Sequence, residues 1–312
     1  MSKPYKCIDS GSKYCPCHLV DTMDCISCSQ LRGEVFCDCQ WNGVCILYEY
    51  YMKNQMVCDQ RLDYESQIVD KINLDENLFL IKIKTDNKLI KELDSIGSYI
   101  FIRKADVNTY HNTPMSVFNL DEDFIYVVYQ AIGPKTKGFN KGDSLILRGP
   151  YWSGIVGEGD LSKIEKESIV IVARGIGQSS ILIPLKKLIH KKNKIVLFLD
   201  EGKLNSLYCL DYVDNKNVKI VIMNMFDAID RKKLEDYIKH NPINIVFSAG
   251  SDMVHREIKS MIEQTDKSIR WFVSNNNILC CGEGLCGSCI RKTKDGDRVK
   301  LCKTVIDPRK IY

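Results

Sequence analysis

Four cysteines near the C-terminal end of the chain constrain its fold and chemistry most strongly. Cys281, Cys286 and Cys289 follow the spacing C-x4-C-x2-C, and Cys302 comes after twelve intervening residues. Glycines and a serine between the thiols allow tight turns that direct backbone N–H groups inward. Four thiolates at this spacing are the ligands of a plant-type [2Fe–2S] cluster, whose sulfur atoms accept hydrogen bonds from backbone amides. The pattern therefore predicts one-electron transfer.

Two other interpretations of these cysteines are weaker. A structural zinc site usually contains two C-x2-C pairs, and this segment has only one. Buried free cysteines explain one or two of these positions, but not four in a glycine-rich loop. Cys280 adjoins Cys281 and competes with it as a ligand, but the spacing favours Cys281.

Composition limits the classes of partner. The chain has 312 residues, which is enough for two or three domains with separate cores. Its 44 basic and 40 acidic residues give a net charge of +4, which indicates neither a nucleic acid nor a membrane as partner. The first residues lack an apolar signal core, and no segment approaches the ~20 apolar residues of a spanning helix. We therefore expect a cytoplasmic protein, and its content of fifteen cysteines points to metal or cluster ligands rather than disulfides.

A second group of cysteines lies at the other end of the chain. Eight of them fall within 39 residues, with the spacing C-x7-C-x-C-x7-C-x2-C-x8-C-x-C-x5-C. The segment has too few aliphatic side chains for a core, so residues 1–60 are predicted to form a metal or iron–sulfur module. Eight thiols fit two four-thiolate sites: two [4Fe–4S] clusters, two zinc ions, or one of each. The spacing differs from the ferredoxin run C-x2-C-x2-C-x3-C, which weakens the double-cluster interpretation. The predicted ligands are Cys7, Cys15, Cys17, Cys25, Cys28, Cys37, Cys39 and Cys45.

The middle of the chain predicts two different sheets. Short strands with alternating apolar residues and frequent turns, between about residues 66 and 149, favour an antiparallel β-barrel. From Ser168 onward, near-continuous apolar runs alternate with amphipathic stretches, which is typical of a doubly wound parallel α/β sheet. The helices expected in this second part are Gln178–Lys191, Ala228–His240 and Met253–Glu263. Cys209 lies in an apolar stretch and is expected in the core, whereas His111 and His255 are expected at the surface.

Loops that follow the parallel strands are candidates for nucleotide binding. Gly175 and Gly177 sit between a predicted strand and a helix, where glycine lets the backbone approach a pyrophosphate. The alternative is that both glycines serve packing. Asp200 and Glu201 end the next strand and would favour NADH by accepting from a ribose 2′-hydroxyl; a solvated turn is the simpler interpretation. Small residues around Gly250 suit the floor of a nicotinamide pocket or a tight turn.

Barrel, parallel sheet and four-cysteine module, in that order, resemble the electron-transfer subunit of NAD-dependent dihydroorotate dehydrogenase, in the ferredoxin–NADP reductase superfamily. The resemblance covers about residues 62–312. It implies an FAD-binding barrel over 61–155, an NAD-binding α/β domain over 156–270 and a [2Fe–2S] module over 271–312. The predicted fold class is thus multi-domain α+β, with the cysteine-rich modules flanking the two sheets.

Family motifs align with four segments, each with a departure. The family's R-P-x-S motif resembles residues 113–116, with threonine at the arginine position. Its glycine–threonine motif resembles 133–136, its G-G-x-G loop resembles 174–177, and its C-G-x-x-x-M segment resembles 249–253. Losing the arginine removes a bidentate phosphate contact, which Lys135 and Arg174 partly replace. The cofactor-binding residues implied are Thr113, Pro114, Ser116, Gly133, Lys135, Thr136, Gly175, Gly177 and Gly250.

Two functions follow from these patterns. In the first, the chain is an oxidoreductase subunit that passes electrons from NAD(P)H through FAD and the [2Fe–2S] cluster to a partner oxidoreductase or another redox protein. In the second, it is a non-catalytic redox partner or sensor that no longer binds FAD or NAD(H), and its N-terminal module binds zinc. Nucleic-acid binding by a zinc knuckle is disfavoured because the cysteine-rich segment carries few basic residues.

Overall fold

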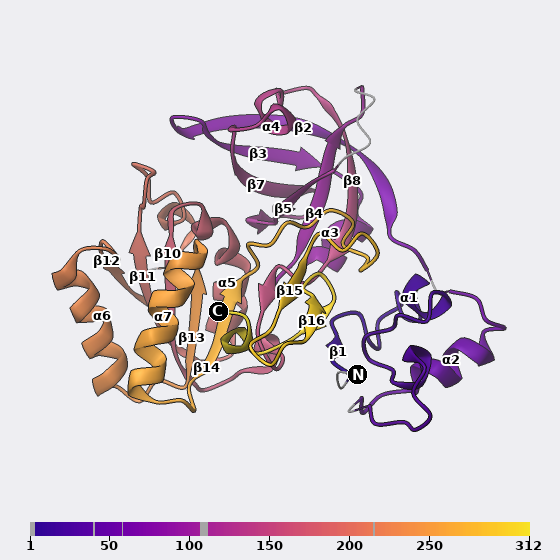
Figure 1. Ribbon diagram of the computed structural model, residues 1–312. Coiled ribbons are helices and arrows are strands. Elements are labelled where there is room, and N and C mark those ends of the chain that lie inside the picture. Colours follow the sequence, from indigo (N-terminus) through magenta and orange to yellow (C-terminus); the bar gives the residue numbers. More distant parts are fainter. Residues whose placement is uncertain (1–3, 40, 58, 107–111, 215) are drawn as a thin grey trace.

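Two sheets form the body of the protein, and the two cysteine-rich ends lie together beside them (Figure 1). The computed structural model describes residues 4–312 except 40, 58, 107–111 and 215. His111 and Cys58 therefore lie outside the described residues. No helix within these ranges is long and apolar enough to cross a membrane.

The first sheet is antiparallel, curled and seven-stranded, with the order β5-β4-β8-β2-β3-β7-β6. Alternate strand residues such as Ile81, Ile83, Ile125 and Val127 point to one side, where they form a core with helix α3. This period of two is the one that the sequence shows. The elements of this part are β2 (Leu62–Asp75), β3 (Leu78–Lys84), α3 (Asn87–Leu93), β4 (Tyr99–Lys104), β5 (Thr113–Ser116), β6 (Asn119–Leu120), β7 (Phe124–Gln130), α4 (Pro134–Lys137) and β8 (Ser144–Tyr151).

The second sheet has six strands in the order β12-β11-β10-β13-β14-β9. Its first five strands are parallel, and β9 pairs antiparallel to β14. The strands are β9 (Ile155–Val156), β10 (Ser168–Arg174), β11 (Lys194–Asp200), β12 (Val218–Ile222), β13 (Ile245–Ala249) and β14 (Arg270–Ser274). The helical segments are η2 (Leu161–Lys163), η3 (Gly175–Ser180), α5 (Leu182–His190), η4 (Leu210–Tyr212), α6 (Ala228–His240) and α7 (Asp252–Thr265).

Helices cover both faces of this second sheet. Val170 and Val172 of β10 share a core with α6 and α7, whereas Ile169 and Ile171 share another with α5. A central strand buried on both faces explains the continuous apolar runs in the sequence. The predicted fold class is therefore confirmed, and Cys209 is fully buried as expected. One helix begins later than predicted, because residues 175–180 form the 3-10 segment η3 before α5 starts at Leu182.

The N-terminal segment is joined to the C-terminal one by a short pair of strands. Strand β1 (Lys6–Cys7) runs antiparallel to β17 (Thr304–Val305), with Cys7 opposite Thr304. The remaining N-terminal elements are α1 (His18–Asp21), η1 (Gln30–Arg32) and α2 (Ile46–Met52). The remaining C-terminal elements are β15 (Ile290–Lys292), β16 (Arg298–Lys300) and η5 (Pro308–Lys310).

Gly177 is required by packing between η3 and β13. A Cβ at this position would lie 2.4 Å from the carbonyl oxygen of Ala249, which is well inside van der Waals contact. We expect Gly177→Ala to lower the free energy of unfolding by about 1–3 kcal/mol, because backbone has to move to admit the methyl group. Chemical denaturation measures the change. Gly138→Ala is the matched control, since no atom lies within 4 Å of that added Cβ. Equal stability of the two variants would contradict this account.

Candidate functional site

The four C-terminal cysteines gather in and beside the loop between β14 and β15. Cys289 and Cys302 are buried, Cys281 is half-buried and Cys286 is exposed. Three backbone N–H groups donate to two of the thiols. Glu283 and Cys286 donate to Sγ of Cys281 over 3.3 and 3.5 Å, and Cys302 donates to Sγ of Cys289 over 3.4 Å. Inward-directed amides of this kind were expected from the glycine-rich spacing.

The thiols also interact directly with one another. A hydrogen bond from the Cys302 thiol lowers the pKa of Cys281 to about 4, against the effect of burial. The Cys302 thiol likewise lowers the pKa of Cys289 to about 7, while its own pKa is raised by the same two contacts. The Cys286 side chain contacts Cys281 as well. The structure therefore brings all four predicted ligands into one group.

This group fits a [2Fe–2S] cluster by its donors. It offers four thiols, and backbone amides already point at two of their sulfur atoms, as such a cluster requires. Over the described part of the chain, no three His, Cys, Asp or Glu side chains stand in an arrangement that could hold a metal ion. The fit is therefore one of donor type and amide direction, and the ligand assignment stays a prediction.

Two glycines let the cysteine loop approach its neighbours closely. Gly282 and Gly284 both adopt positive φ, at +68° and +78°. A Cβ on Gly282 would lie 2.4 Å from the ring of Tyr151, and one on Gly284 would lie 2.9 Å from the side chain of Leu19. The loop thus packs between an aromatic residue of the antiparallel sheet and helix α1 of the N-terminal segment.

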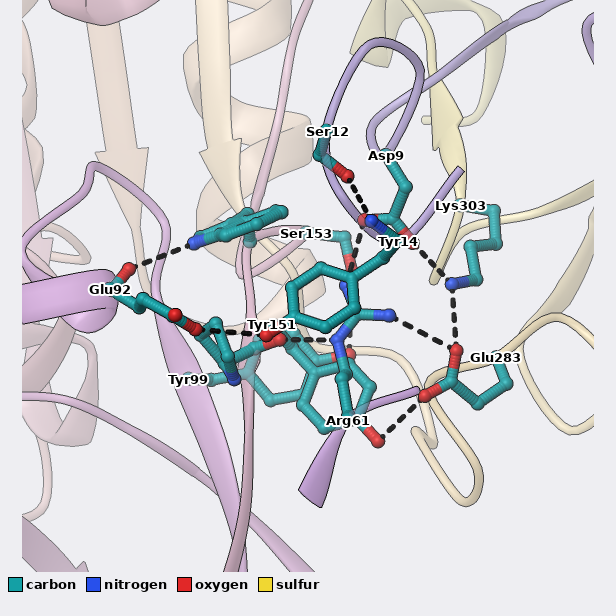
Figure 2. A network of polar contacts seen from close by, with 12 residues as sticks. Asp9, Ser12, Tyr14, Arg61, Glu92, Tyr99, Tyr151, Ser153, Glu283 and Lys303 are labelled. Carbon is teal, nitrogen blue, oxygen red and sulfur yellow. Dashed lines mark hydrogen bonds and ion pairs between the residues drawn. The ribbon is translucent and has the colours of Figure 1, made fainter. Parts of the chain in front are cut away.

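A buried network of four charges surrounds this contact (Figure 2). We call Asp9, Arg61, Glu283 and Lys303 the charge quartet. Arg61 donates to Asp9 over 2.8 Å and to Glu283 over 3.1 Å, and Lys303 donates to Asp9 and, over 3.0 Å, to Glu283. Tyr151 donates its hydroxyl to the second oxygen of Glu283 over 3.0 Å. The quartet joins the N-terminal segment, the residue before β2, the cysteine loop and the residue after Cys302.

The quartet is electrically balanced, which makes its burial tolerable. Burial alone would raise the pKa of Asp9, but the charges of Lys303 and Arg61 hold it below its ordinary value. The two carboxylates raise the pKa of Lys303 in turn, against the effect of burial. The Arg61 guanidinium also stacks between the rings of Tyr14 and Tyr151, at 4.4 Å from each centroid. Two cations and two anions therefore remain charged together inside the protein.

Several N-terminal thiols lie near one another, and Cys15, Cys25 and Cys28 pack in one small core. Burial and then the charges of Cys17 and Cys25 raise the pKa of Cys15 to about 12, and the Cys7 thiol also interacts with Cys17. Burial and then the charges of Cys45 and Cys37 raise the pKa of Cys28, while Sγ of Cys37 lies 3.7 Å from Sγ of Cys39.

The predicted nucleotide-binding glycines of the parallel sheet meet at one edge. Gly175, at φ +56°, and Gly177 follow β10, and Gly250 follows the adjacent strand β13. A Cβ on Gly177 would lie 2.7 Å from the backbone nitrogen of Gly250, so these two positions are filled by packing. Beside Gly175, only the carbonyl oxygen of Glu201 comes within 4 Å. Of the three, only Gly175 leaves room for a ligand to approach.

The surroundings of Asp200 match neither of its two interpretations, the ribose acceptor and the solvated turn. Its carboxylate accepts from Nε of Arg174 over 2.8 Å and from the backbone nitrogens of Gly202 and Met225 over 2.7 and 2.8 Å. Its exposed fraction is only 3%. It is therefore neither a solvated turn nor free to accept from a ribose. Sequence reasoning missed this pair because Arg174 and Asp200 are brought together only by the parallel pairing of β10 and β11.

The predicted flavin-binding residues lie on β5 and around α4. Thr113, Pro114 and Ser116 belong to edge strand β5, and Ser116 lines a cavity of about 10 Å³ together with Ser180 of η3. This cavity holds no more than a water molecule. No atom lies within 4 Å of an added Cβ on Gly133, so a ligand has room beside that backbone.

Of the side chains on α4, that of Thr136 bonds within the protein and that of Lys135 is exposed to solvent. The hydroxyl of Thr136 donates to the carbonyl oxygens of Gln130 and Gly133, each over 3.3 Å. This hydroxyl therefore forms its hydrogen bonds within the protein. Lys135 is exposed beside the open face at Gly133. The ammonium of Lys135 is a cation available there to an anionic group.

His255 is fully buried, so the expectation of a surface residue was wrong. Its Nδ1 hydrogen-bonds Oγ of Ser248 at 2.9 Å, and its Nε2 lies 3.0 Å from Nδ2 of Asn276. Trp271 also donates to Ser248, over 3.1 Å. Burial lowers the pKa of His255 from its ordinary value of 6.5 to about 4. Asn276 also donates to the carbonyl oxygen of Gly250, so this polar group adjoins that glycine, and no local sequence signal indicates it.

The low pKa of His255 predicts a pH-dependent stability. Above pH 6.5 the imidazole is neutral in both the folded and the unfolded chain. As pH falls from 6.5 to about 4, only the unfolded chain gains the proton, so about 3 kcal/mol of stability is lost across that interval. Denaturation curves at several pH values, for wild type and His255→Gln, measure the difference. The variant should lose less stability over this interval, and parallel profiles would contradict the assignment.

Sequence comparison relates this chain to electron transfer subunits of dihydroorotate dehydrogenase B. No family model matches the chain. It is 26% identical over 244 residues to the dihydroorotate dehydrogenase B (NAD(+)) electron transfer subunit of Clostridium acetobutylicum, covering 76% of this chain and 91% of that protein. The corresponding subunit of Clostridium perfringens is 23% identical over 248 residues, covering 77% and 93%.

Solved structures share the arrangement of the two sheets. An NADH-dependent reduced ferredoxin–NADP oxidoreductase superposes with a TM-score of 0.65 and 18% identity, covering 79% of this chain and 89% of that chain. A ferredoxin–NADP+ reductase from Plasmodium falciparum gives 0.53 and 17%, covering 68% and 96%. The resemblance expected from the sequence is thus confirmed: the chain is similar to dihydroorotate dehydrogenase B electron transfer subunits and has the fold of the ferredoxin–NADP reductase superfamily.

Proposed function

We propose that this protein is an electron-transfer subunit that passes electrons between NAD(H), FAD and a partner oxidoreductase through a [2Fe–2S] cluster. The observation that carries the proposal is the group formed by Cys281, Cys286, Cys289 and Cys302, with backbone amides directed at its sulfur atoms. Relatives named as electron transfer subunits of an NAD(+)-dependent dehydrogenase support it. Such subunits act with another subunit, so a catalytic partner is part of the proposal. Reduced thiols fit a cytoplasmic protein.

Each part of the chain has a role in this proposal. Residues 61–155 hold FAD, 156–270 bind NAD(H), 271–312 hold the [2Fe–2S] cluster, and 1–60 form a second metal-binding module. When bound, FAD would accept the two electrons of a hydride and release them one at a time. The cluster would supply a one-electron carrier. The loop amides stabilise thiolate charge, and the Arg61 and Lys303 cations hold the loop against the barrel. Lys135 offers a cation beside the open backbone of Gly133.

A second candidate is a redox partner or sensor that binds neither nucleotide. The pairing of Arg174 with Asp200 favours it, because both side chains are satisfied within the protein. Thr113, in the place of the family's arginine, points the same way. Flavin content separates the two candidates. FAD that remains through desalting supports the first, and a flavin-free protein that keeps its iron supports the second.

The ligand assignment predicts a contrast between adjacent cysteines. Cys281→Ser should lose about two iron atoms per chain and the electron paramagnetic resonance (EPR) signal of the reduced C-terminal cluster, because one of four thiolates is missing. Cys280→Ser should keep both, since Cys280 lies outside the predicted spacing. Iron analysis and EPR of anaerobically purified, dithionite-reduced protein make the measurement. Loss of the signal in Cys280→Ser and not in Cys281→Ser would reverse the assignment.

The flavin site predicts an effect of charge at one lysine. Lys135→Glu replaces a cation beside the open face of Gly133, so the Kd for FAD should rise by at least about tenfold through repulsion of the pyrophosphate. Lys137→Glu makes the same charge change on the same short helix and is the control. Fluorescence titration of deflavinated protein with FAD reads both. An equal change in the Kd for FAD in the two variants would show that Lys135 has no specific role in binding FAD.

A further inference from the structure

Two members of the charge quartet belong to the surroundings of the C-terminal cysteines. Glu283 follows Cys281 by two residues, and its backbone nitrogen donates to Sγ of Cys281 over 3.3 Å. Lys303 directly follows Cys302, and its side chain packs on Gly284, where an added Cβ would lie 3.2 Å from Cγ of Lys303. One anion and one cation of the quartet are therefore carried within two residues of predicted cluster ligands.

The other two charges come from outside the region that resembles known electron transfer subunits. Asp9 belongs to the N-terminal segment and Arg61 immediately precedes β2, whereas the resemblance begins at about residue 62. Figure 2 shows Arg61 and Lys303 converging on the carboxylates of Asp9 and Glu283. An additional segment of this chain therefore supplies charges to the surroundings of the cysteine loop.

The charges of the quartet are shielded from water and held in place. The exposed fractions of Asp9, Arg61 and Lys303 are 1%, 4% and 0%. The Arg61 guanidinium lies between the rings of Tyr14 and Tyr151, and each carboxylate of the quartet accepts from both cations. Buried and fixed charges are little screened by salt, and they do not reorient when a nearby charge changes. They therefore act on a neighbouring redox group more strongly than exposed charges do.

Stability alone is a weak reason for burying this quartet. Apolar residues of similar volume often stabilise an interior at least as well as buried ion pairs, because they avoid the cost of removing charges from water. A [2Fe–2S] cluster in the cysteine loop gives the charges a second role. Its reduction adds one electron and converts one ferric iron to ferrous, with no bond made or broken, so the site becomes more negative by one charge. Nearby cations favour that change and nearby anions oppose it.

We propose that the charge quartet sets the reduction potential of the [2Fe–2S] cluster, with Lys303 favouring the reduced state and Asp9 opposing it. This inference rests on the proposed function, which assigns the cluster to the C-terminal cysteines. Since the backbone nitrogen of Glu283 lies 3.3 Å from Sγ of Cys281, the Glu283 carboxylate lies within roughly 10 Å of that sulfur. At such a separation, one unbalanced unit charge changes the ratio of reduced to oxidised cluster by about tenfold. Asp9 thereby gives the N-terminal segment control over the electron affinity of the cluster.

Opposite charge changes at two positions separate this electrostatic role from a structural one. Lys303→Gln leaves the quartet with one excess negative charge, so the reduction potential of the cluster should fall. Asp9→Asn leaves one excess positive charge, so the potential should rise. In Asp9→Asn/Lys303→Gln the quartet is balanced again, and the potential should lie close to that of wild type. A loosened cysteine loop would instead shift all three variants in the same direction, with the largest shift in the double variant.

Redox titration of the full-length protein, prepared without oxygen, measures these potentials through the EPR signal of the reduced cluster. A pH of about 8 keeps the remaining carboxyl groups ionised, since it lies far above the ordinary pKa of Asp and Glu. At a fixed solution potential, the two single variants should change the ratio of reduced to oxidised cluster by about tenfold in opposite directions. Lys292→Gln is the control, because it removes a cation from an exposed side chain three residues after Cys289 and should change the ratio far less.

Several results would overturn the proposal. Shifts of Lys303→Gln and Asp9→Asn in the same direction, or shifts no larger than that of Lys292→Gln, are two of them. Loss of the cluster from all three quartet variants, while wild type retains it, is a third, because the quartet would then only hold the loop in place. In each of these cases the wild-type EPR signal leaves the proposed function standing. Wild type without that signal would reject the proposed function, and this inference with it.

Discussion

A buried, balanced group of four charges connects the parts of this protein that carry its chemistry. Asp9 comes from the N-terminal segment, Arg61 from the entry to the antiparallel sheet, Glu283 from the cysteine loop, and Lys303 from the position after Cys302. Removing one member would leave an uncompensated charge in the interior, at a cost of about 3–5 kcal/mol. The quartet therefore sets where both cysteine-rich segments sit relative to the barrel and to each other.

Spacing and periodicity predict those features that local sequence determines. Alternating apolar residues predicted the antiparallel strands. Continuous apolar runs predicted strands such as β10, which is buried on both faces. The C-x4-C-x2-C spacing predicted inward-directed amides, and backbone N–H groups donate to the thiols of Cys281 and Cys289. In each case neighbouring residues act together through one short segment of backbone.

Long-range polar contacts escaped prediction because no local pattern encodes them. His255 was expected at the surface, yet it is buried against Ser248 and Asn276, which come from two other segments. Asp200 was expected in a turn or at a ribose, yet parallel pairing of β10 with β11 places it against Arg174. The pairing of β1 with β17 joins residues almost the whole chain apart. Sequence-local reasoning has no access to contacts of this kind.

Anomalous X-ray scattering from crystals grown without oxygen shows directly whether the four C-terminal cysteines hold iron. Data collected on both sides of the iron absorption edge locate iron independently of colour, activity or any mutation. We expect an iron peak enclosed by the thiols of Cys281, Cys286, Cys289 and Cys302, near Lys303 of the charge quartet, which directly follows Cys302. Well-ordered density for these four cysteines with no iron peak among them, or with a peak at the zinc edge instead, would contradict it.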